Sequence, residues 1–162
     1  MKNKLNQKTL SGFFVLHKLY NIKSLSKRIK KNEGFRNKAY KDQLGFLTIG
    51  YGHLIRKNEK HLLTGKKNKN FLNKLFLTDL NRAINDYKKN YRTTKIPQHI
   101  QETIIEMIFQ LGIKKVLEFK KFNMHLKKNE IYLAGYEMLN SLWHKQTPKR
   151  AESLISRILY KK

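Results

Sequence analysis

Two isolated carboxylates lie close together in a chain that is otherwise strongly basic. Glu33 and Asp42 are the only acids before Glu59, and the segment 33–53 also contains Thr48 and four of the eight glycines. Cleavage of a glycosidic bond needs a protonated carboxyl beside the leaving oxygen and a second carboxylate that attacks or activates water. Each acid alone is an ordinary helix-end or turn residue. Together they predict a hydrolytic site for a glycan.

A helix is expected immediately before this segment. The spacing of Leu25 and Ile29, with lysine and arginine between them, predicts a short amphipathic helix. Ser24 or Ser26 is its expected N-cap, because serine side chains accept hydrogen bonds from the first free N–H groups of a helix. Gly34 is its expected end, because glycine readily takes the left-handed conformation there.

A β-hairpin is expected next. Two short runs rich in aromatic and β-branched residues, 39–42 and 46–51, are separated by a turn that contains a glycine. Asp42 and Thr48 would then lie on facing strands, close to the helix end that carries Glu33.

The rest of the chain shows the apolar periodicity of helices. Loops and short helices are expected over 53–70, and a long amphipathic helix over 70–91. Further helical segments are expected at 97–112, at 116–126, at 130–142, and from Pro148 to the end with Thr147 as its cap. The predicted fold class is α+β.

The composition narrows the possible functions. Lys and Arg total 36 against 11 Asp and Glu, which gives a net charge of +25 over 162 residues. Such a charge indicates a polyanionic partner, or a coding bias that enriches lysine on a solvated surface. The absence of cysteine excludes disulfides and thiolate chemistry. His53 has no second histidine at i+3 or i+4, so no zinc site is expected.

The N-terminal segment 1–23 is predicted to be a basic arm or a short amphipathic helix. Its apolar run at 13–16 is broken by polar neighbours and has no small-residue cleavage site, so any export signal is weak or absent. No run approaches the roughly 20 apolar residues of a membrane span.

In the segment 33–53 the sequence closely resembles the phage-type lysozymes, the endolysins that hydrolyse peptidoglycan. Residues 33–36 match a Glu-Gly-x-Arg opening, 40–42 match Tyr-x-Asp, and 45–53 match Gly-x-x-Thr-Ile-Gly-x-Gly-His. Segments 75–79, 107–112 and 143–151 continue the resemblance, which therefore runs from about Leu25 to the C-terminus. The segment 55–70 matches poorly.

The resemblance implies a lysozyme-like domain over residues 24–162. It would have a small lobe with a β-hairpin at about 33–75, a long interlobe helix, and a helical lobe at about 92–162. By the same resemblance Glu33 is the general acid, Asp42 the partner carboxylate, and Thr48 helps to place the attacking water.

Five further residues take roles from the resemblance. Phe109, Gln110 and Arg150 are expected to line the glycan cleft, opposite the hairpin. His53 and Asp79 are expected to form a structural ion pair. Burial would favour the protonated form that a general acid needs at Glu33, whereas Arg150 would favour its carboxylate.

The implied activity is that of a muramidase that cleaves the β-1,4 bond between N-acetylmuramic acid and N-acetylglucosamine. It needs no metal or other cofactor and inverts the anomeric configuration, with carboxyl groups roughly 6.5–9.5 Å apart. Two alternatives remain open from the charge: a basic protein that kills bacteria by binding their wall or membrane, and a nucleic-acid-binding protein. For nucleic-acid binding, the sequence lacks a helix-turn-helix or aromatic RNA-binding signature.

The expected partner is bacterial peptidoglycan, with an anionic membrane or lipopolysaccharide surface as a further one and no specific nucleic acid. We expect a monomeric bacteriolytic enzyme, made in the bacterial cytoplasm, that reaches the wall after release to the periplasm. The release route, through a membrane-permeabilising partner or the N-terminal arm, stays open. So does the origin of the gene, in a phage, a prophage or a host that has co-opted it.

Overall fold

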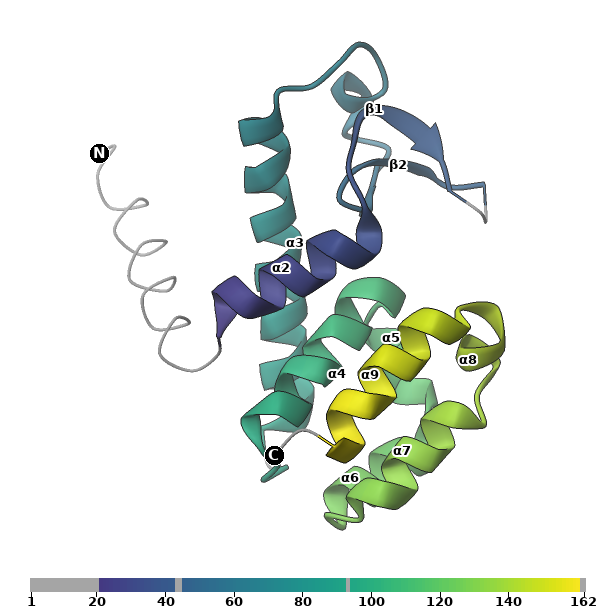
Figure 1. Cartoon of the computed structure of the whole chain (residues 1–162). Helices are drawn as coiled ribbons and strands as arrows, with labels where there is room; N and C mark the ends of the chain where they lie inside the picture. Colours follow the sequence, from purple (N-terminus) through teal and green to yellow (C-terminus); the bar gives the residue numbers. More distant parts are fainter. Residues whose placement is uncertain (1–20, 43–44, 93, 161–162) are drawn as a thin grey trace, which may run out of the picture.

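The computed structural model describes residues 21–42, 45–92 and 94–160 (Figure 1). The expected N-terminal arm lies outside these residues except for its last three positions. Within them, none of the helices is both long and apolar enough to cross a bilayer.

The first described helix is α2, Ile22–Glu33. Leu25 and Ile29 are fully buried, as their spacing predicts. The expected serine cap is wrong, because the cap is Asn21, whose side chain accepts a hydrogen bond from the Ser24 N–H at 3.0 Å. The helix ends where predicted, before Gly34 in a positive-φ conformation.

A three-stranded antiparallel sheet follows α2. It consists of β1 (Arg36–Lys41), β2 (Leu47–Gly50) and β3 (His53–Leu54), in the order β1-β2-β3. The predicted hairpin is confirmed, with Tyr40 opposite Thr48. Two details differ from the expectation, since Asp42 directly follows β1 and a short third strand lies where only loops and helices were expected. Gly50 and Gly52, both at positive φ, reverse the chain and bring His53 back beside β2.

The sheet has a small hydrophobic core of its own. Ile49, Leu62 and Leu72 are buried together, with Ile55 and Leu75 packed against them. Leu62 comes from η1, a 3₁₀ helix at Lys60–Leu62. The helix that supplies Leu72 therefore shares this core with the sheet.

The long helix α3, Lys69–Tyr91, matches the predicted segment and runs from the sheet into the helical part of the molecule (Figure 1). Asn68 caps its start by accepting a hydrogen bond from the Asn70 N–H at 2.7 Å. Its later buried residues, from Phe76 to Tyr91, belong to a second and larger core together with α2 and the C-terminal helices. One helix thus joins the two cores.

The helical part contains more breaks than predicted. Its elements are α4 (Gln98–Leu111), α5 (Ile113–Glu118), α6 (Lys120–Lys127), α7 (Ile131–Leu139), α8 (Leu142–Gln146) and α9 (Pro148–Tyr160). The continuous segment expected at 116–126 is wrong, because Phe119 adopts a non-helical ψ of 65° and separates two helices. The segment expected at 130–142 is also interrupted, and Ser141 caps a new helix by accepting from the His144 N–H.

Thr147 does precede the last helix, and its carbonyl accepts the Ala151 N–H at 3.0 Å. Its hydroxyl, however, donates back to the Trp143 carbonyl at 3.1 Å. Thr147 therefore links the two helices, with its hydroxyl bonded to α8 and its carbonyl to α9.

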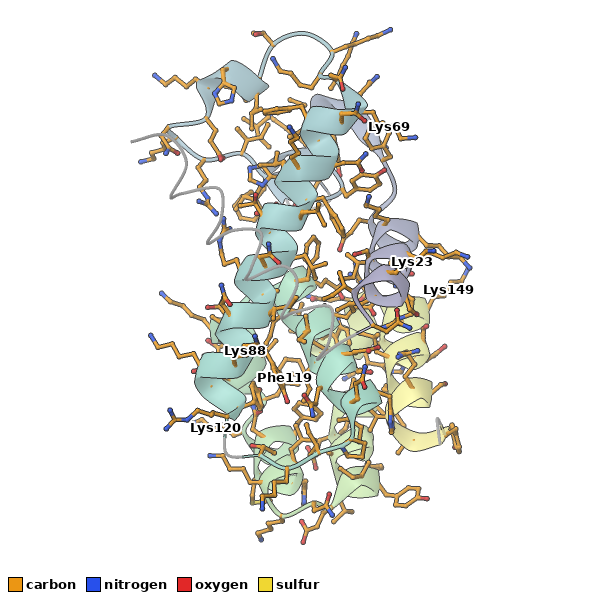
Figure 2. The ribbon with its side chains drawn as sticks, turned by 90° about the vertical axis from the view of Figure 1, so that its left-hand side faces the viewer. Lys23, Lys69, Lys88, Phe119, Lys120 and Lys149 are labelled. Carbon is orange, nitrogen blue, oxygen red and sulfur yellow. The ribbon has the colours of Figure 1, made fainter. Side chains whose placement is uncertain are left out.

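Most of the charge lies at the surface, where labelled lysines such as Lys88 and Lys120 extend away from the ribbon (Figure 2). Two acids are the exception. Glu102 and Glu106, on α4, are 4% and 0% exposed. Nothing in the local sequence pattern predicted that they would be buried.

These buried carboxylates bind basic and amide groups from two other helices. Arg28 on α2 contacts both, with Nη2 3.3 Å from Glu102 Oε2 and Nε 3.3 Å from Glu106 Oε2. Asn32 donates to Glu106 Oε1 at 2.9 Å, and Arg157 on α9 lies 3.5 Å from Glu102. Two buried negative charges thus hold α2, α4 and α9 together.

We predict that Arg28→Leu destabilises the protein far more than Lys27→Leu. Removing Arg28 leaves two buried carboxylates short of their partner, and breaking a buried ion pair from one side costs about 3 kcal/mol or more. Lys27 lies one residue earlier on the same helix and is exposed. Urea denaturation of both variants measures the difference, and equal losses would contradict the role given to the buried pair.

Candidate active site

Glu33 is the last residue of α2, and its side chain is 17% exposed. Its Oε1 lies 2.7 Å from Nη2 of Arg150, in the first turn of α9. The expected approach of this arginine to the predicted acid is therefore present. The contact ties the C-terminal end of α2 to a residue more than a hundred positions away in the sequence.

The other oxygen of Glu33 lies against the turn between β2 and β3. A Cβ atom built on Gly52 would come 2.8 Å from Glu33 Oε2, and Gly52 has a φ of +79°. Both the backbone conformation and the close approach require glycine at this position. The carboxylate is thus held between Arg150 on one side and the backbone of the sheet on the other.

Asp42 and Thr48 meet at the backbone of Phe46. Asp42 Oδ1 accepts the Phe46 N–H at 2.8 Å, and the Asp42 N–H donates to the Phe46 carbonyl at 2.9 Å. The same carbonyl accepts the Thr48 hydroxyl at 3.1 Å. Asp42 therefore stabilises the turn, as an aspartate commonly does. The same turn fixes the position of the Asp42 carboxylate relative to the buried Thr48 hydroxyl.

His53 lies between two carboxylates. Its Nδ1 is 2.6 Å from Asp79 Oδ2, the contact expected from the sequence, and its Nε2 is 3.0 Å from Glu59 Oε2. The second partner was not predicted, because Glu59 lies in the poorly matching segment. It is positioned by the Arg56 N–H, which it accepts at 2.9 Å.

The surroundings of His53 shift its protonation. Burial disfavours the imidazolium, but the hydrogen bonds and charges of Asp79 and Glu59 outweigh burial and raise the pKa of His53 above its ordinary value of 6.5. Burial likewise opposes ionisation of Glu59, yet the Arg56 N–H and His53 together lower its pKa below 4.5. His53 therefore links β3 to α3 through Asp79 and to the loop that carries Glu59.

A row of aromatic rings connects the sheet to the helical part. The ring centroids of Phe35 and Tyr51 are 4.9 Å apart, and those of Tyr51 and Phe76 are 5.5 Å apart. Phe109 continues the row, 5.5 Å from Phe76. Lys30 Nζ lies over the Tyr51 and Phe76 rings at 4.7 and 4.8 Å. Burial, and then the charge of Lys69, lower the pKa of Lys30.

The three expected cleft residues differ in what they contact. Arg150 reaches Glu33. Phe109 packs against the larger core as part of the aromatic row and also lines a cavity of about 200 Å³ beside Gly52 and His53. Gln110 is half-buried, and its Oε1 is buried without a hydrogen-bond partner among the described residues.

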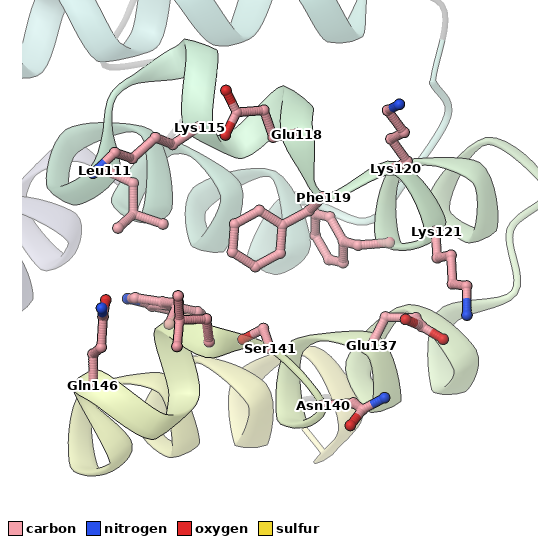
Figure 3. Close-up of a pocket in the computed structure, with 13 residues that line it drawn as sticks. Leu111, Lys115, Glu118, Phe119, Lys120, Lys121, Glu137, Asn140, Ser141 and Gln146 are labelled. Carbon is pink, nitrogen blue, oxygen red and sulfur yellow. The ribbon is translucent and has the colours of Figure 1, made fainter.

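A second and larger cavity, of about 560 Å³, lies between α5–α6 and α7–α8 (Figure 3). Phe119 and Trp143 give it an apolar wall, and Lys115 and Glu118 add charged groups. The Trp143 Nε1 is buried and finds no hydrogen-bond partner in the described part of the chain. This cavity was not predicted, and one of its lining residues, Phe119, lies at the unpredicted helix break.

Comparison with known proteins gives concordant matches. The model of the phage lysozyme family matches residues 30–158. Two Dictyostelium discoideum proteins, probable T4-type lysozymes 1 and 2, are 29% and 30% identical to the chain, covering 83% of it and 93% of each relative. The pre-baseplate central spike protein Gp5 of Enterobacteria phage T4 is 27% identical over 84% of the chain and 28% of its own length.

We predict that Gly52→Ala lowers wall hydrolysis at least about tenfold, since displacement of a reacting group by about 1 Å can cost a hundredfold. Its methyl group would meet the Glu33 carboxylate. Gly65→Ala is the matched control, because Gly65 has a φ of +70° but no atom within 4 Å of a built Cβ. Both variants should lose about 1–2 kcal/mol of stability from the left-handed backbone. The rate of hydrolysis of purified walls distinguishes the two variants. Equal rates would show that the close approach of Gly52 to Glu33 does not position the carboxylate.

We predict that His53 stabilises the fold most in mildly acidic solution. A raised folded pKa gives stability that is complete below about pH 6.5 and lost as the pH rises through the folded value. The lowered pKa of Glu59 gives stability that is present above about pH 4.5 and lost as the pH falls through its folded value. The unfolding free energy of wild type minus His53→Gln should therefore be larger at pH 5.5 than at pH 8.5. His61→Gln, which replaces an exposed histidine, is the control for the loss of an imidazole side chain.

Proposed function

The chain belongs to the phage lysozyme family, and from that membership we propose that Glu33, Asp42 and Thr48 cleave the β-1,4 bond between N-acetylmuramic acid and N-acetylglucosamine. The membership makes the protein a lysozyme, an enzyme that hydrolyses peptidoglycan. The observation that carries the more specific proposal is the Glu33 carboxylate, held between Arg150 and Gly52 at the edge of the sheet that carries the other two residues.

In the proposed reaction Glu33 is the general acid. Its proton passes to the glycosidic oxygen as the bond from that oxygen to the anomeric carbon breaks. A water molecule attacks the anomeric carbon from the opposite face, and its proton passes to the Asp42 carboxylate. Solvent then exchanges protons with both acids and restores the starting state.

Attack from the opposite face inverts the configuration, so the first product carries an α-anomeric hydroxyl. Inversion needs room for a water molecule between Asp42 and the sugar, hence the expected carboxyl separation of roughly 6.5–9.5 Å. Thr48 supports this geometry, since its hydroxyl and the Asp42 carboxylate are both anchored on Phe46. Proton NMR of the fresh product tests the stereochemistry, and a β-anomer would exclude inversion.

The glycan is proposed to lie between the hairpin and the start of α9. Arg150 keeps the Glu33 side chain in place, and Gln110 offers its buried Oε1 to a hydroxyl or amide of the substrate. Phe109 has an indirect role: its ring packs against Phe76, which in turn packs against Tyr51.

We further propose that the biological role is bacteriolytic. The enzyme acts as a monomer, is made in the bacterial cytoplasm, and reaches the wall after release to the periplasm. The names of two relatives, probable T4-type lysozymes of Dictyostelium discoideum, support a wall-degrading activity.

We predict that Glu33→Gln reduces the release of wall fragments by at least about a hundredfold, the usual contribution of a general acid. Mass spectrometry of a digest of purified peptidoglycan makes the measurement. The wild type should release fragments with reducing N-acetylmuramic acid ends, whereas 1,6-anhydro ends would indicate a transglycosylase. Glu152→Gln, at an exposed acid on α9, should retain full activity.

The alternative of killing by charge alone is tested with the double variant Glu33→Gln, Asp42→Asn. This variant keeps every lysine and becomes more basic by two charges. If it still clears intact cells as fast as the wild type, the protein acts through its charge. If it loses clearing together with fragment release, the hydrolytic site is responsible.

A further inference from the structure

Large apolar side chains gather on the outer side of α7. Five of the fourteen exposed large hydrophobic side chains of the described residues fall within residues 132–142. Tyr132, Tyr136 and Leu142 are 74%, 61% and 69% exposed. We call this cluster the α7 face: Tyr132, Leu133, Tyr136, Leu139 and Leu142.

The spacing puts most of these residues on one stripe. Positions 132, 136 and 139 follow the i, i+4, i+7 pattern, so their side chains lie within roughly 60° of one another around the helix axis. The inner side of α7 is closely packed between α6 and α9. A Cβ on Gly135 would come 2.7 Å from the Leu159 side chain. Helix α7 therefore cannot rotate to bury the exposed stripe, because its opposite side is already packed against α6 and α9.

The surroundings of the α7 face are basic. Residues 119–160 contain six Lys and three Glu, a net of +3, besides Arg150 and Arg157, which pair with Glu33 and Glu102. Two of the three acids contact histidines, Glu130 with His125 at 2.6 Å and Glu152 with His144 at 3.1 Å. Lys127 and Lys128 precede α7 and Lys145 follows Leu142, all of them exposed.

We propose that the α7 face docks on the surface of an anionic lipid bilayer. Tyrosine and leucine side chains suit the boundary between headgroups and acyl chains, and nearby lysines bind anionic headgroups while their stems stay in contact with apolar surface. A second copy of the chain is a poorer occupant, because pairing these faces would bring together two molecules of charge +25.

The location makes docking compatible with hydrolysis. Helix α7, which carries most of the α7 face, lies in the helical part of the molecule, away from β1 and β2 (Figure 1). Attachment would hold the enzyme at a membrane while the catalytic side stays open to the wall. The inference does not rest on the proposed roles of Glu33, Asp42 and Thr48.

Flotation with vesicles tests the proposal. The wild type should bind vesicles of phosphatidylcholine with one quarter phosphatidylglycerol, more weakly at 300 mM than at 50 mM salt, and should not bind phosphatidylcholine alone. Tyr132→Ser with Tyr136→Ser should weaken binding about tenfold or more. The control pair Leu63→Ser with Phe71→Ser removes two apolar groups that are 40% and 42% exposed and lie outside the α7 face, and it should bind like the wild type.

Circular dichroism checks that both double variants are folded, and hydrolysis of lipid-free peptidoglycan should be unchanged in the tyrosine variant. If the wild type did not hydrolyse peptidoglycan, the proposed reaction would be refuted, but the result of the vesicle-binding experiment would still stand. Three results would overturn the proposal: no binding by the wild type, equal binding by the tyrosine variant, or equal weakening in the control pair. Sedimentation that shows a dimer dissolved by the tyrosine substitutions would assign the face to a second copy instead.

Discussion

The contact between Glu33 and Arg150 is the constraint on which the arrangement of the molecule depends. It joins the end of α2 to the start of α9 at 2.7 Å, while Gly52 brings the sheet against the opposite oxygen of the same carboxylate. Three segments that are far apart in the sequence thus meet on one side chain. The position of the carboxylate therefore depends on how rigidly each of these segments is held by the rest of the fold.

The buried carboxylates of α4 supply much of that rigidity. Asn32 precedes Glu33 directly, and its bond to Glu106 fixes the last turn of α2 from the side facing the core. Arg157 links α9, which carries Arg150, to the neighbouring Glu102. Both sides of the Glu33–Arg150 contact are therefore attached to the same helix. Burying two charges is costly, and a hydrophobic core of equal volume is often as stable. Directional bonds, however, define positions along the helix more narrowly than apolar packing does.

The sequence predicted the parts of the fold that depend on local signals. Gly34, Pro97 and Pro148 mark helix ends by their backbone preferences, and the apolar period of residues 70–91 identifies α3. The acid Glu33 and its neighbours in the hairpin were found because their types and spacing match a known family. The missed contacts depend on distant partners. Glu59 joins His53 across a loop, Glu106 contacts Arg28 across the core, and the ring of Phe119, at the helix break, lies 6.2 Å from that of Trp143, centroid to centroid. No window of neighbouring residues contains those partners.

The net charge and the exposed apolar side chains are distributed differently over the described surface. A net charge of +25 attracts any polyanion and by itself gives no preferred orientation, since lysines lie over much of the described surface. An exposed apolar stripe at one end adds direction, because only that end gains from leaving water. Wall glycan and membrane are both anionic in bacteria, and an enzyme bound by charge alone would present its cleft at random. In the proposed docking, the net charge would bring the molecule to the membrane, and the apolar α7 face would set its orientation there.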